Sequence, residues 1–394
     1  FSGADGVKAD PAFFLELGVL LLLLGVAGAF AWRIGLSAVP LFLLAGLLVG
    51  EGGFLPAPTA GPFLGFAAGI GMVLLLLVLG LEFSSAEFTQ ALRHHAPSGV
   101  VDLVLNATPG ALVGWILGLG LPGILALAGI TWISSSGIVA RTISDLGRLG
   151  YRETPSVLSV LVLEDIAMAV FLPILGVVLA GGGPGAAVGG VTLAVSALVV
   201  ALVLSRRAAA PLERLLAHDS DEQVMLRVLG LTLLVAGAAE LAGVSAAVGA
   251  FLVGLSIPGE TARAARRVLG PLRDLFAAAF FLSFAYGTDP ADLVPVLPIA
   301  LGLAVVTAAT KVATGWYAAS RDGVGTRGRW RAGLSLVARG EFSIVIAGLA
   351  VAAGLGEVGP LATAYVLLLA IAGPVLARLA GQRRDGLRAL ARPA

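Results

Sequence analysis

Residues 155–180 read PSVLSVLVLEDIAMAVFLPILGVVLA, an apolar stretch whose only charged residues are Glu164 and Asp165. A helix needs about 20 apolar residues to cross the roughly 30 Å hydrocarbon core of a bilayer, so this stretch is long enough to span one. At about 1.5 Å per residue from Pro155, both acids lie near the middle of the span. Because an ionised group at that depth costs at least about 2.5 kcal/mol, the two carboxylates are candidate functional residues.

The whole chain shares this apolar character. Of its 394 residues, 58% are hydrophobic and only 12% are charged, whereas about 25% of the residues in a typical soluble protein are charged. This composition excludes a cytosolic enzyme, a nucleic-acid-binding protein and a secreted scaffold, and it predicts a lipid bilayer as the surroundings. The chain contains no cysteine, so disulfides and thiolate metal sites are excluded. We expect no cofactor.

Thirteen apolar segments are long enough to be membrane-spanning helices, which predicts an all-α polytopic membrane protein. The segments cover residues 13–32, 36–55, 63–83, 97–120, 122–145, 155–180, 186–206, 224–241, 244–258, 270–286, 293–319, 331–354 and 358–380.

The positions of the basic residues predict the orientation. All but three of the 25 Lys and Arg residues follow odd-numbered segments, and the loops after even-numbered segments hold none. Basic loops are cytoplasmic by the positive-inside rule, so we expect a multi-pass protein of the cell (inner or plasma) membrane with its N-terminus outside and its C-terminus cytoplasmic. The first twelve residues lack a basic n-region, so we expect the first segment to be retained. We expect no regulatory domain in this chain.

Two of the three remaining basic residues, Lys311 and Arg339, lie inside apolar segments. Lysine readily loses its proton when it is desolvated, whereas arginine does not. The sequence leaves open whether Lys311 cycles protons or forms a permanent ion pair with Glu164.

Two segments contain residues that favour a break in the helix. Residues 134–137 read SSSG and residues 338–341 read ARGE. Non-helical backbone at membrane depth persists only where protein or a water-filled cavity satisfies it, and half-helix ends there can bind ions. The two segments cross the membrane in opposite directions, which predicts inverted repeats with two discontinuous crossing helices. The candidate supporting residues are Ser134, Ser135, Ser136, Arg339 and Glu341.

Asp102 and Asn106 are four residues apart and share one face of the segment at 97–120. Two interpretations stay open. The two side chains line a cytoplasmic funnel, or they form hydrogen bonds across a helix interface.

The chain resembles the Kef-type and NapA-type monovalent cation:proton antiporters over nearly all its length. The resemblance rests on residues 40–50 (PLFLLAGLLVG) and 73–83 (VLLLLVLGLEF), on the two predicted breaks and on the Glu164–Asp165 pair. It implies a NhaA/NapA-like fold forming a homodimer, with residues 1–394 as one exchanger domain. The implied parts are a scaffold at 13–83 and 224–286, a transport core at 97–180 and 293–380, and a linker helix at 186–206.

The resemblance also implies residue roles. Asp165 is expected to bind the transported metal cation or a proton in competition, with Glu164 facing Lys311. NapA-type members carry Asp at the position of Glu164 and Kef-type members commonly carry Gln, so Glu is a departure from both. The expected function is exchange of H⁺ for Na⁺ or K⁺ by alternating access, serving pH homeostasis. The preferred ion and the stoichiometry stay open.

Three alternatives are weighed against exchange. A sodium-coupled organic-anion symporter of similar fold could use Arg339 as an anion site, but the mid-membrane acids disfavour one. A channel is disfavoured because no loop resembles a selectivity filter. An intramembrane protease needs a metal-binding histidine pair or an aspartyl dyad on two helices, and the sequence predicts neither, so we do not expect an enzyme.

Overall fold

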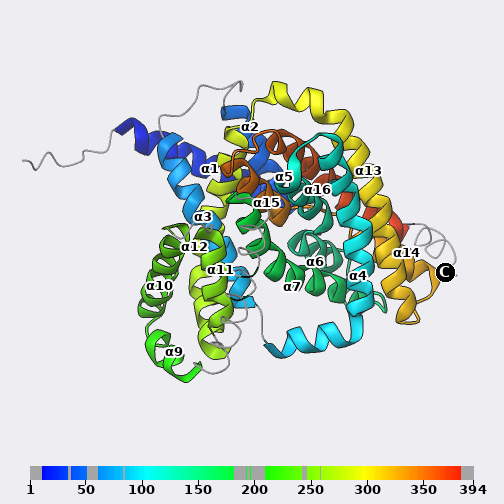
Figure 1. The fold of residues 1–394 in the computed structure, drawn as a ribbon, viewed down its shortest axis with the longest axis horizontal. Coiled ribbons are helices and arrows are strands. Elements are labelled where there is room, and N and C mark those ends of the chain that lie inside the picture. The colour runs from blue at the N-terminus through cyan, green and yellow to red at the C-terminus, as the bar shows by residue number, and fades with distance from the viewer. Residues whose placement is uncertain are drawn as a thin grey trace, which may run out of the picture.

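The computed structural model describes residues 11–33, 37–50, 61–82, 85–181, 209–241, 246–257 and 259–382, together with residues 192 and 196 (Figure 1). Within these ranges the regular secondary structure is helical and no strand occurs. The helices are α1 (Pro11–Arg33), α2 (Val39–Val49), α3 (Gly61–Glu82), α4 (Ser85–Ile116), α5 (Gly120–Trp132), α6 (Ser136–Asp145), α7 (Thr154–Leu179), α9 (Ala209–Leu216), α10 (Asp221–Leu241), α11 (Ala246–Ser256), α12 (Gly259–Tyr286), α13 (Pro290–Arg321), α14 (Thr326–Ser335), α15 (Glu341–Ala352) and α16 (Val358–Gln382).

Every predicted segment except the one at 186–206 overlaps a helix, although residues 36, 51–55, 83, 244, 245 and 258 of these segments lie outside the described residues. The segment at 186–206 lies outside the described residues, apart from 192 and 196, so the count of thirteen stays a prediction. In the described part of the chain, nine spans are long and apolar enough to cross a membrane, and α2, α11 and α15 are shorter apolar helices. The structure therefore confirms an all-helical membrane architecture.

Several helices run beyond the predicted apolar segments. α12 begins at Gly259, whereas the apolar segment begins at residue 270, and α4 begins at Ser85, ahead of residue 97. α9 was not predicted at all. The reason is physical, because backbone hydrogen bonding continues through polar residues beyond the limits of the apolar run.

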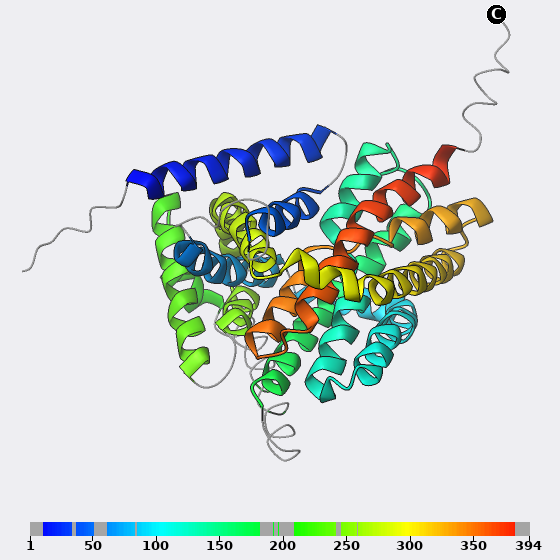
Figure 2. The same ribbon diagram turned by 90° about the horizontal axis from the view of Figure 1, so that it is seen from above.

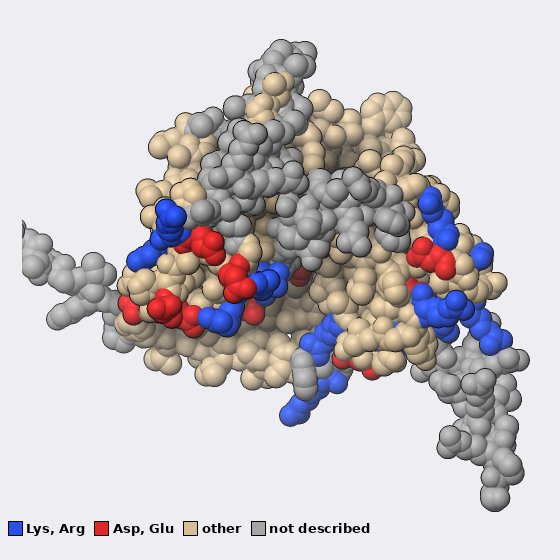
Figure 3. Space-filling model, turned by 90° about the horizontal axis from the view of Figure 1, so that it is seen from below, with Lys and Arg blue, Asp and Glu red and all other residues tan. Residues whose placement is uncertain are grey.

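Apolar side chains face outward on many helices. Phe14, Leu22, Trp115 and Leu234 are all more than half exposed. Such a surface is unfavourable in water but matches the lipid that surrounds a membrane-spanning helix. Figure 3, which views the molecule from below Figure 1, shows charged side chains of the described residues gathered in separate groups among uncharged ones.

The helices pack into two groups. α1, α2, α3, α10, α11 and α12 pack mainly on one another, and α4 to α7 pack mainly with α13 to α16. Figure 2 shows the first group on the left and most of the second on the right. Between the groups, α16 packs on α2, α7 packs on α11 and α15 packs on α12.

Glycine allows unusually close helix approach within each group. A Cβ placed on Gly315 of α13 would lie 2.5 Å from the Cα of Gly333 in α14, and one on Gly254 of α11 would lie 2.9 Å from the Cα of Gly80 in α3. Any larger residue would separate these backbones. The α13–α14 contact fixes the position of the helix that precedes the second predicted break.

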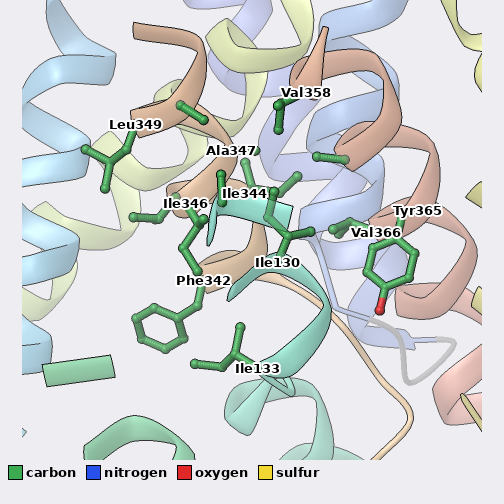
Figure 4. Packing of buried hydrophobic residues seen from close by; sticks show 14 of the residues in the cluster. Ile130, Ile133, Phe342, Ile344, Ile346, Ala347, Leu349, Val358, Tyr365 and Val366 are labelled. Atoms are coloured by element: carbon green, nitrogen blue, oxygen red, sulfur yellow. The ribbon is translucent and has the colours of Figure 1, made fainter. Parts of the chain in front are cut away.

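A buried apolar cluster surrounds the inner ends of α5 and α15. It includes Ile130 and Ile133 near the end of α5, Phe342 and Ile346 in α15, and Tyr365 in α16 (Figure 4). This cluster holds the two interrupted helices against α16.

Candidate functional site

The two predicted helix breaks are present and lie side by side. α5 ends at Trp132 and α6 begins at Ser136, while α14 ends at Ser335 and α15 begins at Glu341. The Ser135 N–H donates to the carbonyl of Ala338 at 2.9 Å. The Ser134 hydroxyl donates to the carbonyl of Leu336 at 3.0 Å. The two non-helical stretches therefore satisfy part of each other's backbone.

Arg339 lies in the second break and is completely buried. Its guanidinium donates to the carbonyl of Thr131 near the end of α5 at 3.0 Å, and to the carbonyls of Leu336 and Val337 after α14 at 3.3 and 3.2 Å. Its Nε donates to the Tyr365 hydroxyl at 3.1 Å. Helix C-terminal carbonyls carry partial negative charge, so one cation stabilises the C-terminal ends of both interrupted helices. Arg339 is thus enclosed by protein acceptors and does not provide the anion site that the symporter alternative required.

The N-terminal ends of α6 and α15 lie on a more accessible part of the crossing. The Ser135 side chain caps α6 by accepting from the Ile138 N–H at 3.3 Å. The two carboxylate oxygens of Glu341 lie 3.7 and 3.8 Å from where a Cβ on Gly137 would be. Ser136 and Glu341 are partly exposed and Gly137 is exposed. Helix N-termini favour negative charge, so Glu341 is well placed beside the first turn of α6.

Lys311 of α13 forms two ion pairs inside the protein. Its Nζ lies 2.6 Å from Asp102 Oδ1 of α4 and 2.6 Å from Glu164 Oε1 of α7. The side chains of Lys311, Asp102 and Glu164 are 0%, 1% and 2% exposed, respectively. This cluster joins three helices without access to water. The sequence predicted the Lys311–Glu164 contact but not the Lys311–Asp102 contact.

Asp102 is surrounded by hydrogen-bond donors. Its Oδ1 also accepts from the Asn106 side-chain amide, and its Oδ2 accepts from the Trp132 indole N–H, both at 2.9 Å. The Asn106 carbonyl oxygen accepts from the Thr310 hydroxyl at 2.7 Å, and its amide donates to the Thr314 hydroxyl at 3.1 Å. Both Asp102 and Asn106 are buried, so in this structure they form hydrogen bonds across a helix interface and do not line an open funnel.

Trp132, Thr310 and Thr314 were not identified from the sequence. The two threonines lie one residue before and three residues after Lys311 in α13. Thr314, three residues after Lys311, lies on the same side of a helix as the lysine, and Thr310 lies four residues before Thr314 on the adjoining face. Closeness to Lys311 in the sequence could have identified the two threonines. No sequence feature could have identified Trp132, because a tryptophan in an apolar helix is usually a packing residue.

Glu164 is bound to the first break. Its Oε2 accepts from the Ser134 backbone N–H, and its Oε1 lies 3.1 Å from the Ser134 hydroxyl. The Ser134 N–H is free for this contact because the helix ends before it. The buried acid therefore connects α7 both to the interrupted helix and to Lys311.

Asp165 follows Glu164 in α7 but lies in different surroundings. Successive residues of a helix point about 100° apart, and Asp165 is partly exposed whereas Glu164 is buried. It lies roughly 16 Å along the helix from Thr154. Within the described residues, no three or more Asp, Glu or His side chains gather as a metal-binding cluster. A cation at Asp165 would therefore also need hydroxyl, carbonyl or water oxygens as ligands.

Comparison with known proteins shows to which family this chain belongs. A family model described as "Sodium/hydrogen exchanger, transmembrane" matches residues 18–380. The chain is 33% identical over 378 residues to the K(+)/H(+) antiporter subunit KhtU of Bacillus subtilis, covering 92% of each chain. It is 29% identical to the ammonium/H(+) antiporter subunit AmhT of Alkalihalophilus pseudofirmus, covering 94% of this chain and 93% of AmhT.

The fold has a similar solved structure. The sodium proton antiporter MjNhaP1 of Methanocaldococcus jannaschii aligns with a TM-score of 0.66 at 19% identity, covering 94% of this chain and 99% of MjNhaP1. The family match covers residues 18–380, and the interrupted helices and mid-membrane charges lie within it. This chain belongs to the sodium/hydrogen exchanger family, whose members similar to it are cation/proton antiporters.

Proposed function

We propose that this protein exchanges protons for Na⁺ or K⁺ across the membrane, with Asp165 binding either a proton or the cation. The observation that carries the proposal is the contrast within α7. Glu164 is buried and bound to Lys311 and Ser134, whereas its neighbour Asp165 is partly exposed at mid-span. Only a carboxylate that ions can reach is able to exchange them, so Asp165 is the better candidate.

The chemistry follows from the cost of a bare charge in the membrane. An ionised carboxylate that moves through the hydrocarbon region carries a penalty of at least about 2.5 kcal/mol, which either a proton or a bound cation removes. Hard cations such as Na⁺ and K⁺ favour oxygen ligands. We propose that Ser136, backbone carbonyls at the breaks and water complete the ligand set. Competition for one carboxylate then couples the two fluxes.

Alternating access needs one part of the molecule to move against another. We propose that the transport core, at about 97–180 and 293–380, moves against a scaffold at about 13–83 and 224–286. The linker helix at about 186–206 would connect them, and the scaffold would form the homodimer. The separate packing of the two helix groups supports this division. The basic loops after odd-numbered segments support a cytoplasmic C-terminus.

The transported cation is proposed from chemistry and similarity together. The names of the similar proteins refer to K⁺, ammonium and sodium. Exchange of such ions for protons would make the protein a regulator of cytoplasmic pH. We propose transport without an enzymatic activity.

The proposal is tested by measuring cation/proton exchange by the Asp165→Asn variant in proteoliposomes. The purified variant and the wild type are compared for pH-gradient-driven uptake of Na⁺ and K⁺. The variant keeps the size of the side chain but cannot alternate between a carboxylate and a carboxylic acid, so its exchange should fall to that of protein-free liposomes. Asp292→Asn removes an exposed acid from the outer end of α13 and serves as the matched control. Retained coupled flux in Asp165→Asn would contradict the proposal.

A further inference from the structure

A hollow of about 530 Å³ lies where two connections between helices meet. One side comes from residues 150–153, which lead into α7, and the other comes from residues 324 and 325 and the first turns of α14. Sites for small molecules commonly have volumes of about 300–1,000 Å³. The proposed exchange at Asp165 does not use this hollow. We propose that it binds a phosphate group presented at the cytoplasmic face, with Arg331 as the fixed anchor.

The hollow carries excess positive charge. Its charged lining residues are Arg152, Arg327, Arg331 and Glu153, which gives the lining a net charge of +2. Arg152 and Arg327 are exposed, and within the described residues neither forms an ion pair or a hydrogen bond. An anion that enters the hollow therefore displaces no existing partner from these two side chains.

Arg331 is held in place without a ligand. Its Nε donates to Oε1 of Glu153 at 2.5 Å, and its guanidinium carbon lies 5.0 Å from the centre of the Tyr151 ring. Within the described part of the chain, its two terminal nitrogens form no hydrogen bond. Those nitrogens carry four N–H donors in a planar arrangement that matches the oxygens of a phosphate. Because Arg331 is already ordered, binding costs less side-chain entropy.

The basic side chains also affect one another. Arg148 lies in the connection between α6 and α7, where it is buried and donates to the carbonyl of Ala377 at 2.9 Å. Burial, followed by the charge of Arg331, lowers the pKa of Arg148. Like charges held this close repel each other, and a bound anion relieves that repulsion.

The first turn of α14 adds partial positive charge on the same side. Helix N-termini favour anions, phosphate included, and Gly325, which precedes the helix, has no side chain to cap it. Glu153 occupies part of this position, since its Oε2 lies 2.9 Å from where a Cβ on Gly328 would be. Thr326 and Arg327 remain exposed along the hollow. The helix end thus supports a site that the arginines define.

Basic residues in cytoplasmic loops are common in membrane proteins and by themselves indicate only orientation. Two observations here go beyond that rule. Three arginines line one hollow, and Arg331 is only 24% exposed with its terminal nitrogens directed to no acceptor in the described chain. By contrast, Arg263 and Arg267 of α12 are about 70% exposed and pair with Glu260 and Asp221.

The phosphate group has two possible sources, a soluble phosphate compound or the headgroup of a phospholipid. Either one would contact both the connection that leads into α7, the helix of Asp165, and the first turn of α14, which precedes the second break. A bound phosphate would therefore join the cytoplasmic ends of these two helices.

Thermal unfolding of the purified chain in detergent tests binding and separates the two sources. Inorganic phosphate is titrated against chloride at constant ionic strength, and phosphatidic acid is titrated against phosphatidylcholine in mixed micelles. A ligand that binds only the folded state stabilises it, so we expect a saturable rise in melting temperature with one or both probes. A response to phosphate identifies a soluble ligand, and a response to phosphatidic acid alone identifies a lipid headgroup. No saturable response to either probe overturns the proposal.

A double variant, Arg152→Gln with Arg327→Gln, locates the site. Its matched control is Arg263→Gln with Arg266→Gln, which removes the same charge from exposed positions of α12. Charge-assisted hydrogen bonds to phosphate are strong, so the first variant should bind the probe at least about ten-fold more weakly. The control should bind as the wild type does. Equal affinities of the two double variants overturn the proposal, because the attraction would then be a property of the whole basic surface.

Arg331→Lys tests the anchor without removing its charge. Lysine lacks the planar set of donors, so we expect weaker binding of the same probe, and wild-type affinity would overturn the role of Arg331. The inference does not rest on the proposed exchange. Asp165→Asn should therefore bind the probe with wild-type affinity even though it loses exchange. Loss of binding in Asp165→Asn would place the ligand in the ion pathway and overturn its assignment to this hollow.

Discussion

The two sides of the helix crossing differ in how deeply their charged side chains are buried. On one side, Lys311, Asp102 and Glu164 form a buried cluster whose polar atoms bond to protein. On the other side, Asp165 and Glu341 are partly exposed. Neighbouring residues of one helix, Glu164 and Asp165, fall on different sides because successive residues turn by about 100°. A single membrane-spanning helix thus carries one buried acid and one partly exposed acid.

Substitutions on the two sides should therefore have different effects on stability and transport. Substitutions in the buried cluster should lower stability, because they leave charges or hydrogen-bonding groups unpaired. Substitutions on the accessible side should stop transport at little cost in stability. Measuring both quantities on the same purified variants separates the two roles.

The largest loss of stability is expected for Lys311→Met. It leaves Asp102 and Glu164 buried side by side without their cation, and removing one partner from a buried ion pair typically costs about 3–5 kcal/mol. Thermal unfolding in detergent measures the loss, with Asp292→Asn as the control. A Lys311→Met variant as stable as the wild type would show that the cluster does not hold α4, α7 and α13 together.

Arg339→Lys should have the next largest effect. Lysine keeps the charge but cannot reach the carbonyls of both interrupted helices with a planar set of donors. Hydrogen bonds to charged groups contribute about 1.5–3 kcal/mol each, so we expect a destabilisation of about 2 kcal/mol or more. The same thermal assay measures it. An unchanged melting temperature would argue against Arg339 stabilising the ends of α5 and α14.

Ser134→Ala tests the link between Glu164 and the first break. The variant removes the hydroxyl but keeps the backbone N–H that donates to Glu164. A typical hydrogen bond contributes about 1 kcal/mol, so a loss of that size is expected in thermal unfolding. A loss as large as that of Lys311→Met would place Ser134 at the centre of the buried cluster.

The smallest change in stability is expected for Asp165→Asn, although this variant should lose exchange completely. Substitution of a partly exposed residue by one of the same size should cost less than about 1 kcal/mol. Thermal unfolding and proteoliposome flux are measured on the same preparation. Strong destabilisation of Asp165→Asn would mean that both acids of α7 are structural and would remove the contrast between the two sides.

Features encoded locally in the sequence could be predicted. The breaks at 134–137 and 338–341 were identifiable because serine, glycine and charge interrupt apolar runs. Glu164 and Lys311 stood out because ionised groups at mid-membrane need an explanation. The structure confirms both breaks and the contact between those two side chains.

Features that depend on packing could not be predicted. Asp102 and Lys311 are 209 residues apart in the chain, and no local pattern states that α4 and α13 meet at this point. For the same reason the sequence could not decide between the two interpretations of Asp102 and Asn106. The extension of α12 to Gly259 was missed because hydrophobicity reports the extent of the lipid and not the extent of the helix.

Proton release on cation binding tests the central claim most directly. Purified protein in weakly buffered detergent solution receives Na⁺ or K⁺, and a pH indicator records the protons released. If cation and proton compete for Asp165 as proposed, the wild type should release a proton as the cation binds, whereas Asp165→Asn should release none. Equal release from the wild type and from Asp165→Asn would show that the competing carboxylate lies elsewhere.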